Sequence, residues 1–287
     1  MAESGRLSDA ESVLRQYLTA QPRSPDAYFL LGYVLFRRIQ EDARRGPEGA
    51  HSESTREAAK ASLAAYAEGS RYGEPNAFHL KIAALDQSLV GNLVLADGLL
   101  TRSVAANPAD AEAWYYLGRT KYNENRFEEA VQAFQTCLAL EPRNVKAQDN
   151  LGLSYAGLGR AEDATAAYQA AIAWQAQGAV QDAGPFLNLG TLLIERNRPR
   201  DAVPHLLRAV EIAPGEPRSH QQLGKAYLQL DEPERAQSEL ERAVELNPES
   251  APLHFMLGQA YRRVGLIDKA KAEFARSAAL NASRLTR

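Results

Sequence analysis

A period of 34 residues runs through most of this 287-residue chain and limits its possible folds more than any other feature. The pair Leu117-Gly118 returns one period later as Leu151-Gly152, and Ala130 and Phe134 follow the first pair at fixed distances. Further copies of the pair are Leu189-Gly190, shifted by four extra residues, Leu223-Gly224 and Leu257-Gly258. A fixed period of this length indicates one supersecondary unit repeated along the chain.

The apolar residues within each unit have the spacing of two helices. In the unit 111–144 they form two helical faces, one with Trp114, Leu117 and Tyr122, the other with Ala130, Phe134, Cys137 and Leu138. The slot between the helices holds residues that tolerate a left-handed backbone, namely Gly91, Asn125, Gly159, Asn197, Asp231 and Gly265. Good N-cap residues precede six units: Ser24, Asn76, Asp110, Asn144, Asp182 and Ser250. Glu216 is the exception.

This helix-turn-helix pattern resembles the tetratricopeptide repeat family over essentially the whole chain. In the unit 111–144 the resemblance is carried by Trp114, Leu117, Gly118, Tyr122, Ala130, Phe134, Cys137 and Pro142. It implies an all-α fold: an α-solenoid of stacked helix-turn-helix repeats that coils as a right-handed superhelix. We expect Gly118 to face Ala130, so that the two helices of a unit can cross closely.

The resemblance also divides the chain, which we expect to be a single solenoid domain over 1–287. The expected repeats are 25–76, 77–110, 111–144, 145–182, 183–216, 217–250 and 251–284, preceded by a half repeat at 5–24 with Gly5 in its turn slot. The half repeat lacks its first helix, which suggests that the natural chain continues upstream of Met1. Leu7, Leu14 and Leu18 would then be uncovered, and weak end-to-end self-association is expected.

Two insertions interrupt the period. Four extra residues in 145–182 are expected to lengthen the second helix of that repeat by about one turn. Eighteen extra residues in 25–76 fall around 41–56, where Gly46, Pro47 and Gly49 disfavour helix and the Ser54/Glu57 capping-box spacing restarts it. This second insertion is either a surface loop or a loop that folds over a bound ligand.

Charge and hydropathy exclude several classes of partner. The 33 basic and 36 acidic residues give a net charge of −3, so no excess of positive charge points to nucleic acid or a membrane surface. No apolar run approaches the roughly 18 to 20 residues that cross a bilayer, and we expect no membrane insertion. The compartment stays open: cytoplasmic, or periplasmic or secreted if an upstream signal has been removed.

No residues are grouped as an enzyme or a metal site requires. The histidines His51, His79, His205, His220 and His254 are scattered, and none pairs at the spacing of a helical metal site. No glycine-rich phosphate-binding motif occurs, and Cys137 occupies a slot that elsewhere holds alanine. We therefore predict no catalytic residue, no cofactor and no metal.

The resemblance places the function on the outward positions of the first helices, which meet the ligand in this family. These positions hold Phe29, Tyr33, Phe36, Lys81, Leu85, Tyr115, Tyr116, Arg119, Tyr122, Lys146, Asn150, Asn188 and Gln222. Aromatic and arginine side chains concentrate binding energy, although about half of these residues are expected to pack between helices. Asn150 and Asn188, followed by Gln222, form a short amide ladder that is expected to face solvent until an extended backbone binds.

The predicted function is a non-catalytic scaffold that binds a protein or peptide ligand, extended or helical, in the concave groove of the solenoid. Two alternatives stay open. One is a regulatory or substrate-recruiting arm of a larger enzyme such as a glycosyltransferase, and the other is a self-assembling structural module.

Overall fold

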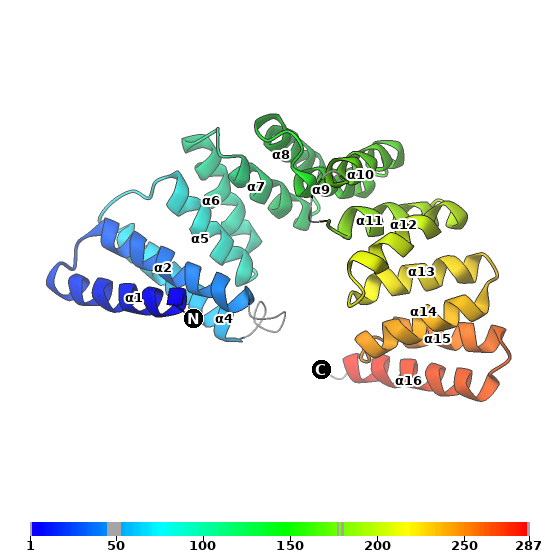
Figure 1. The fold of residues 1–287 in the computed structure, drawn as a ribbon. Helices are drawn as coiled ribbons and strands as arrows, with labels where there is room; N and C mark the ends of the chain where they lie inside the picture. Colours follow the sequence, from blue (N-terminus) through cyan, green and yellow to red (C-terminus); the bar gives the residue numbers. More distant parts are fainter. Residues whose placement is uncertain (1, 45–52, 177, 179–180, 286–287) are drawn as a thin grey trace. The chain divides into compact units, whose positions relative to one another are not determined.

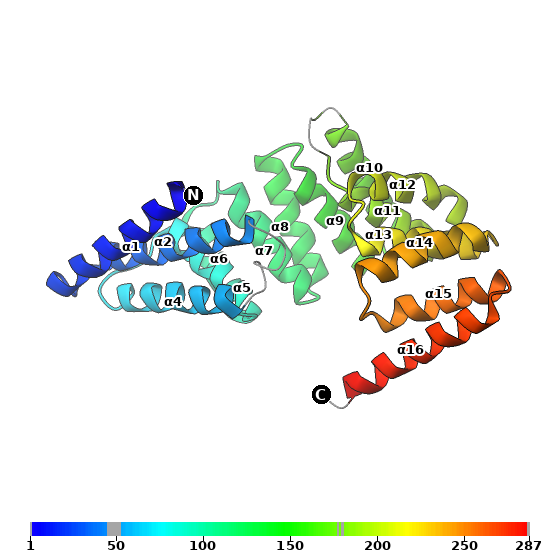
Figure 2. The same cartoon turned by 60° about the horizontal axis from the view of Figure 1, so that its bottom comes forward.

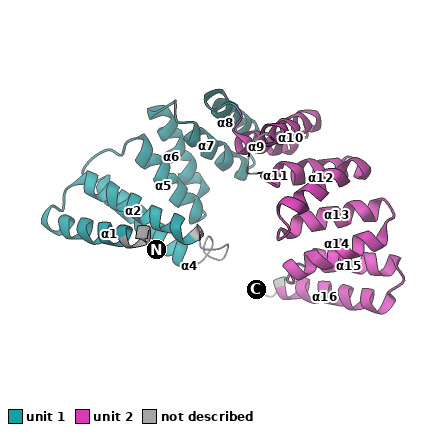
Figure 3. Ribbon diagram, viewed as in Figure 1, with its two compact units in different colours: residues 1–142 teal, residues 143–287 magenta. Residues whose placement is uncertain are grey.

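The computed structural model describes residues 2–44, 53–176, 178 and 181–285. These residues form fifteen helices and no strand, which confirms the predicted all-α solenoid (Figure 1). The chain divides into two compact units, residues 1–142 and residues 143–287 (Figure 3). The single domain over 1–287 stays a prediction.

Unit 1 contains seven of the described helices and unit 2 contains eight. In unit 1 they are α1 (Ala2–Ala20), α2 (Pro25–Arg44), α4 (Glu53–Gly69), α5 (Ala77–Leu89), α6 (Leu93–Ala106), α7 (Ala111–Asn123) and α8 (Phe127–Leu140). In unit 2 they are α9 (Val145–Gly157), α10 (Ala161–Gln175), α11 (Gly184–Glu195), α12 (Pro199–Ile212), α13 (Pro217–Gln229), α14 (Pro233–Leu246), α15 (Ala251–Arg263) and α16 (Ile267–Leu285).

Helix packing follows the order of the chain within each unit. Each first helix packs on its own second helix, as α5 does on α6, and each second helix packs on the next first helix, as α6 does on α7. Successive first helices also touch, so α5 lies between α2 and α7. This packing of each repeat on its nearest neighbours defines a solenoid, in which neighbouring repeats bury a continuous core.

The turns inside the repeats have the predicted left-handed backbone. Asn125, Asn197 and Asp231 have φ of 59°, 56° and 59°, and Gly91, Gly159 and Gly265 have φ between 72° and 85°. Arg143 also has a positive φ, of 75°, outside these slots, and arginine is not a residue type that favours this conformation.

The helix caps agree with the sequence in part. The side chains of Asn76, Asp110 and Asn144 accept a backbone N–H of the first turn, as predicted. Ser250 makes no such bond. Glu216 does cap its helix, by accepting the Arg218 N–H at 3.1 Å, so its treatment as an exception was wrong.

The first-helix glycines contact a different residue from the one expected. A Cβ atom on Gly118 would lie 2.7 Å from the ring of Phe134, so Phe134, and not Ala130, covers the glycine. The same contact recurs at Gly32 with Tyr66, Gly152 with Tyr168, Gly190 with Leu206, Gly224 with Leu240 and Gly258 with Phe274. The large residue fills the space that the missing side chain leaves.

The two insertions have different effects on helix length. Helix α10 has 15 residues against 14 in α12, so the four extra residues lengthen it by one residue and not by a turn. The longer insertion extends α2 to 20 residues, compared with 13 in α5 and α7. The turn residues Gly46, Pro47 and Gly49 lie outside the described residues.

Helix α1 packs along α2 (Figure 2). Gly5 lies inside this helix and not in a turn, because α1 already begins at Ala2. Leu18 is buried and Leu14 packs in the same cluster, so these leucines face α2. The exposed apolar residues of α1 are instead Val13 and Tyr17.

Candidate partner-binding surface

The first helices of unit 1 form a pocket with a volume of about 410 Å³. We call it the α2–α5–α7 pocket, and define it by its lining residues: Phe36, Ile39, Gln40, Leu85, Ser88, Leu89, Leu93, Tyr116, Arg119, Thr120 and Asn123. All but Leu93, the first residue of α6, belong to the three first helices. Within each helix these residues are spaced i, i+3 and i+4, so each of the three helices turns one face toward the pocket.

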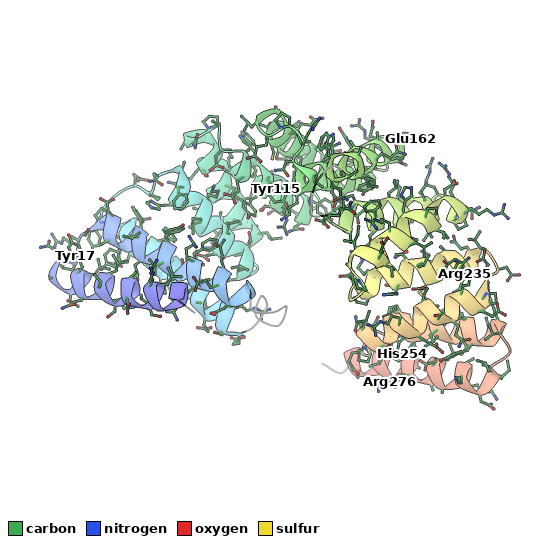
Figure 4. All side chains as sticks on the ribbon, viewed as in Figure 1. Tyr17, Tyr115, Glu162, Arg235, His254 and Arg276 are labelled. Atoms are coloured by element: carbon green, nitrogen blue, oxygen red, sulfur yellow. The ribbon has the colours of Figure 1, made fainter. Side chains whose placement is uncertain are left out.

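Four of the predicted partner-binding residues line this pocket: Phe36, Leu85, Tyr116 and Arg119. Tyr115 lies beside them on α7 (labelled in Figure 4), with its ring 5.3 Å from that of Tyr116. The Arg119 guanidinium lies 5.8 Å from the Tyr115 ring. The sequence thus identified the part of α7 that faces the pocket.

An apolar strip continues from the pocket toward the N-terminal ends of α2 and α5. Tyr33 is half-buried, and its ring meets that of Phe78 at 5.1 Å, edge to face. Phe78 and Leu30 stay exposed on the same two helices. Phe78 was not among the predicted residues, although it lies seven residues, or about two helical turns, before Leu85 and so on the same face of α5.

Two of the predicted aromatic residues are buried and do not present an outward surface. Phe29 is 2% exposed and packs against Tyr66 and His79, so the core of unit 1 occupies it. Phe36 is 5% exposed and reaches only the floor of the pocket. Aromatic side chains bury readily between neighbouring helices, and slot position alone did not distinguish these from exposed ones.

Lys81 is also buried, at 6% exposure, where an outward position was expected. Its Nζ donates to Asp110 at 2.8 Å and to Glu112 at 2.7 Å, both from the next repeat. Burial alone would lower the pKa of Lys81, but the two carboxylates outweigh it and leave the pKa raised. The lysine therefore links α5 to the start of α7 and is not available to a partner.

The extension of α2 supplies a wall of the pocket that the sequence did not predict. Ile39, which is 4% exposed, and Gln40 lie in the part of α2 made longer by the insertion. The insertion was expected to interrupt helix, yet the run up to Arg44 contains neither Gly nor Pro. The lack of Gly and Pro in this run was the feature of the sequence that could have predicted the longer helix.

The predicted amide ladder of unit 2 is only partly open. Asn150 is half-buried, and its Nδ2 donates to the carbonyl of Lys146 in its own helix at 2.8 Å. Asn188 does not face solvent freely, because its Nδ2 donates to both carboxylate oxygens of Asp149, at 3.0 and 3.1 Å. Burial raises the pKa of Asp149 to about 6, even though the bond from Asn188 acts to lower it.

The remaining predicted residues differ in environment. Lys146 is exposed, and Gln222 is half-buried on α13. Tyr122 is half-buried, with its ring 5.5 Å from that of Phe127. None of these three lines the α2–α5–α7 pocket.

Comparison with known families settles the class of repeat. Tetratricopeptide repeat profiles match residues 2–74, 111–144, 145–177, 217–260 and 251–284. The chain belongs to the tetratricopeptide repeat family. Proteins of this family are generally non-catalytic interaction scaffolds.

Relatives of this tetratricopeptide repeat protein match it over limited regions. The human PEX5-related protein is 34% identical over 90 residues, which cover 31% of this chain and 14% of the relative. The solved structure of YrrB, described as a tetratricopeptide repeat protein with an unusual peptide-binding site, has a TM-score of 0.52 and 20% identity, covering 65% of this chain and 94% of YrrB. The solved structure of PilW, a type IV pilus biogenesis factor, has a TM-score of 0.64 and 16% identity, covering 71% of this chain and 92% of PilW. Because both identities are below 25%, the two likenesses show a shared fold and nothing further.

In this tetratricopeptide repeat protein, the position that Trp114 occupies in its repeat makes the same polar contact in several repeats. Trp114 Nε1 donates to the carbonyl of Pro108 at 2.9 Å. The histidines in the same slot of later repeats, His220 and His254, approach the corresponding proline carbonyls with Nε2, at 3.1 and 2.9 Å; of the two, His254 is labelled in Figure 4. Both histidines are buried, as predicted for packing residues.

Other polar and reactive groups lie apart from the surface. Within the described ranges, no three His, Cys, Asp or Glu side chains are grouped as a metal ion requires. Cys137 is fully buried, which raises the pKa of its thiol to about 11. No helix in the described part of the chain is both long and apolar enough to cross a bilayer.

The carboxyl group of Asp86 lies in an unfavourable position in unit 1. Asp86 on α5 is 0% exposed, and neither of its oxygens has a hydrogen-bond partner among the described residues. The Ser62 hydroxyl on α4 donates instead to the carbonyl of Gly32, at 2.8 Å. Burial raises the pKa of Asp86 to about 8.

Proposed function

We propose that this protein is a non-catalytic scaffold that binds a peptide or protein segment across the first helices of unit 1. The observation that carries the proposal is the α2–α5–α7 pocket, which three successive first helices build together. Its volume falls within the roughly 300 to 1,000 Å³ of ligand pockets in proteins. A side chain of the partner would bury its apolar surface there.

The composition of the surface supports this proposal. Tyr116 and Arg119 belong to the residue types in which binding energy concentrates, and Leu85 and Leu89 give the pocket apolar walls. The exposed Leu30 and Phe78 extend the apolar surface along α2 and α5, so a segment longer than one residue finds further contacts. In unit 2, Lys146, Asn150, Asn188 and Gln222 are proposed as a separate and more polar surface.

The comparisons support a binding role at a coarser level. The family consists largely of interaction scaffolds, and YrrB, which has the same fold, is described by its peptide-binding site. Because the aligned region spans 14% of the human PEX5-related protein, the activity of that whole protein is not transferred to this chain.

Site-directed disruption of the pocket tests the proposal. Leu85→Glu places a charge in the apolar pocket, and we expect recovery of co-purifying partners to fall at least tenfold by quantitative pull-down. Leu207→Glu is the matched control, because Leu207 is exposed on the second helix α12 of unit 2. Circular dichroism should show both variants folded. Equal recovery with the two variants would refute the proposed site.

A further inference from the structure

The α2–α5–α7 pocket has one charged side chain in its wall. Arg119 is exposed at the pocket, and the other lining residues are apolar or uncharged. No carboxylate among the described residues forms an ion pair with its guanidinium, which lies 5.8 Å from the Tyr115 ring. In contrast, the cations Lys81 and Lys121 of the same helices each pair with carboxylates.

We propose that the pocket binds an acidic segment of a partner protein. A large apolar side chain of the segment fills the pocket, and the carboxylate of a neighbouring Asp or Glu pairs with Arg119. This inference rests on the proposed function and specifies the chemistry of its partner. The planar guanidinium fits a carboxylate with two parallel hydrogen bonds, and the apolar wall beside it strengthens the attraction by excluding water.

Helix ends near the pocket do not cancel this positive charge. The pocket reaches the C-terminal ends of α5 and α7, where a helix dipole is negative. Three of the last four carbonyls of each helix already accept N–H groups of the following turn: those of Asp86, Gln87 and Ser88 in α5, and those of Thr120, Lys121 and Tyr122 in α7. The guanidinium is therefore the strongest unneutralised charge that a ligand meets.

The polar rim favours a chain that passes across the pocket over one that ends in it. Gln40 lies on α2 and Asn123 on α7, on opposite sides of α5. Each amide both donates and accepts hydrogen bonds, so the two can bind the ligand backbone before and after the buried side chain. The recognised carboxylate is thus assigned to an internal side chain and not to a free C-terminus.

Selection from short random peptides tests this assignment. The peptides are displayed with both ends fused to a carrier protein, so that no free C-terminus is available, and are selected on the full chain. We expect enrichment of peptides in which a large apolar residue lies next to or near Asp or Glu. The best sequence is then synthesised with a blocked C-terminus, and its Kd is measured by fluorescence anisotropy.

Variants separate the role of charge from that of the pocket. We expect Arg119→Gln to weaken binding of this peptide about tenfold, the effect of one charged hydrogen-bonding contact. Arg119→Glu should weaken it further, and a new selection on that variant should enrich Lys or Arg. Arg23→Gln is the control, because Arg23 is an exposed cation in the loop between α1 and α2.

Each result has a distinct meaning. If binding survives Leu85→Glu, the peptide does not use the pocket, and both the proposed function and this inference are refuted. If Leu85→Glu abolishes binding but the peptides are not acidic and Arg119→Gln binds as wild type, only the inference is refuted. A requirement for a free C-terminal carboxylate would overturn the assignment to an internal side chain.

Discussion

The glycine of each first helix lies against a large side chain with no room for a Cβ atom. For Gly118 that side chain is Phe134, which is 0% exposed and has little space into which to move. We predict that Gly118→Ala lowers the free energy of unfolding by about 1 to 3 kcal/mol through overpacking. The measurement is urea unfolding followed by circular dichroism.

Gly98 provides the matched control for this substitution. It lies within helix α6 with nothing within 4 Å of a built Cβ atom. Gly98→Ala should therefore stabilise the protein, by about 0.5 to 1 kcal/mol, because alanine favours helix. Changes in the same direction for both variants would show that the contact with Phe134 is not tight.

A second residue-scale prediction concerns the buried carboxyl of Asp86. Its pKa is about 8 in the folded protein against an ordinary 3.8, so the folded state binds more protons between these values. Stability should therefore be highest at the acid end of this range and fall as the pH rises toward about 8. Asp86→Asn removes the titrating group and should flatten this part of the pH profile.

The measurement uses Trp114 fluorescence during urea unfolding in a Trp174→Phe background, where Trp114 is the one tryptophan left. It compares the slopes of stability against pH, since the substitution also changes the absolute level. Asp268→Asn is the control, because the Asp268 side chain is fully exposed. An unchanged slope in Asp86→Asn would mean that Asp86 is already ionised in the folded protein.

At the scale of the element, the helix caps allow a paired test in unit 2. The Asn144 side chain accepts the Ala147 N–H at 2.9 Å, whereas Ser250 makes no side-chain cap bond. We expect Asn144→Ala to cost about 1 kcal/mol and Ser250→Ala only a few tenths. Thermal unfolding of both variants checks this, and equal losses would contradict it.

Local features of the elements were predictable from the sequence, and their tertiary consequences were not. The left-handed turns at Asn125 and Asn197 were correctly predicted, because that conformation depends on the residue itself. The burial of Phe29 and the pairing of Asn188 with Asp149 depend on side chains from neighbouring helices. The extension of α2 needed both, since the run from Tyr33 to Arg44 contains no helix breaker and the burial of Ile39 between neighbouring helices adds packing that the sequence did not show.

At the scale of the whole molecule, helices contact near neighbours within each compact unit, so damage should remain local. Leu206 in unit 2 is 0% exposed, and Leu206→Ala should cost about 2 to 5 kcal/mol. We expect faster amide hydrogen exchange in α11, α12 and α13, and unchanged exchange in α1, α2 and α4 of unit 1.

The neighbouring Leu207 is the control, because it is 44% exposed and Leu207→Ala should change exchange little. Faster exchange throughout both units in Leu206→Ala would show that the chain unfolds as one cooperative body.

A prediction that carries over family positions treats all repeats alike. For this reason it predicted Tyr116 and Arg119 as outward residues but not the pocket that they line together with the lengthened part of α2.

The contact between each glycine and the large side chain of its own repeat also has a spectroscopic consequence. In four repeats the covering group is an aromatic ring, on Tyr66, Phe134, Tyr168 and Phe274, and in two it is the aliphatic side chain of Leu206 or Leu240. The glycine proton that occupies the place of a Cβ atom therefore lies beside an aromatic ring, and in its ring current, at Gly32, Gly118, Gly152 and Gly258. Its resonance should be displaced in the proton NMR spectrum at those glycines and remain ordinary at Gly190 and Gly224.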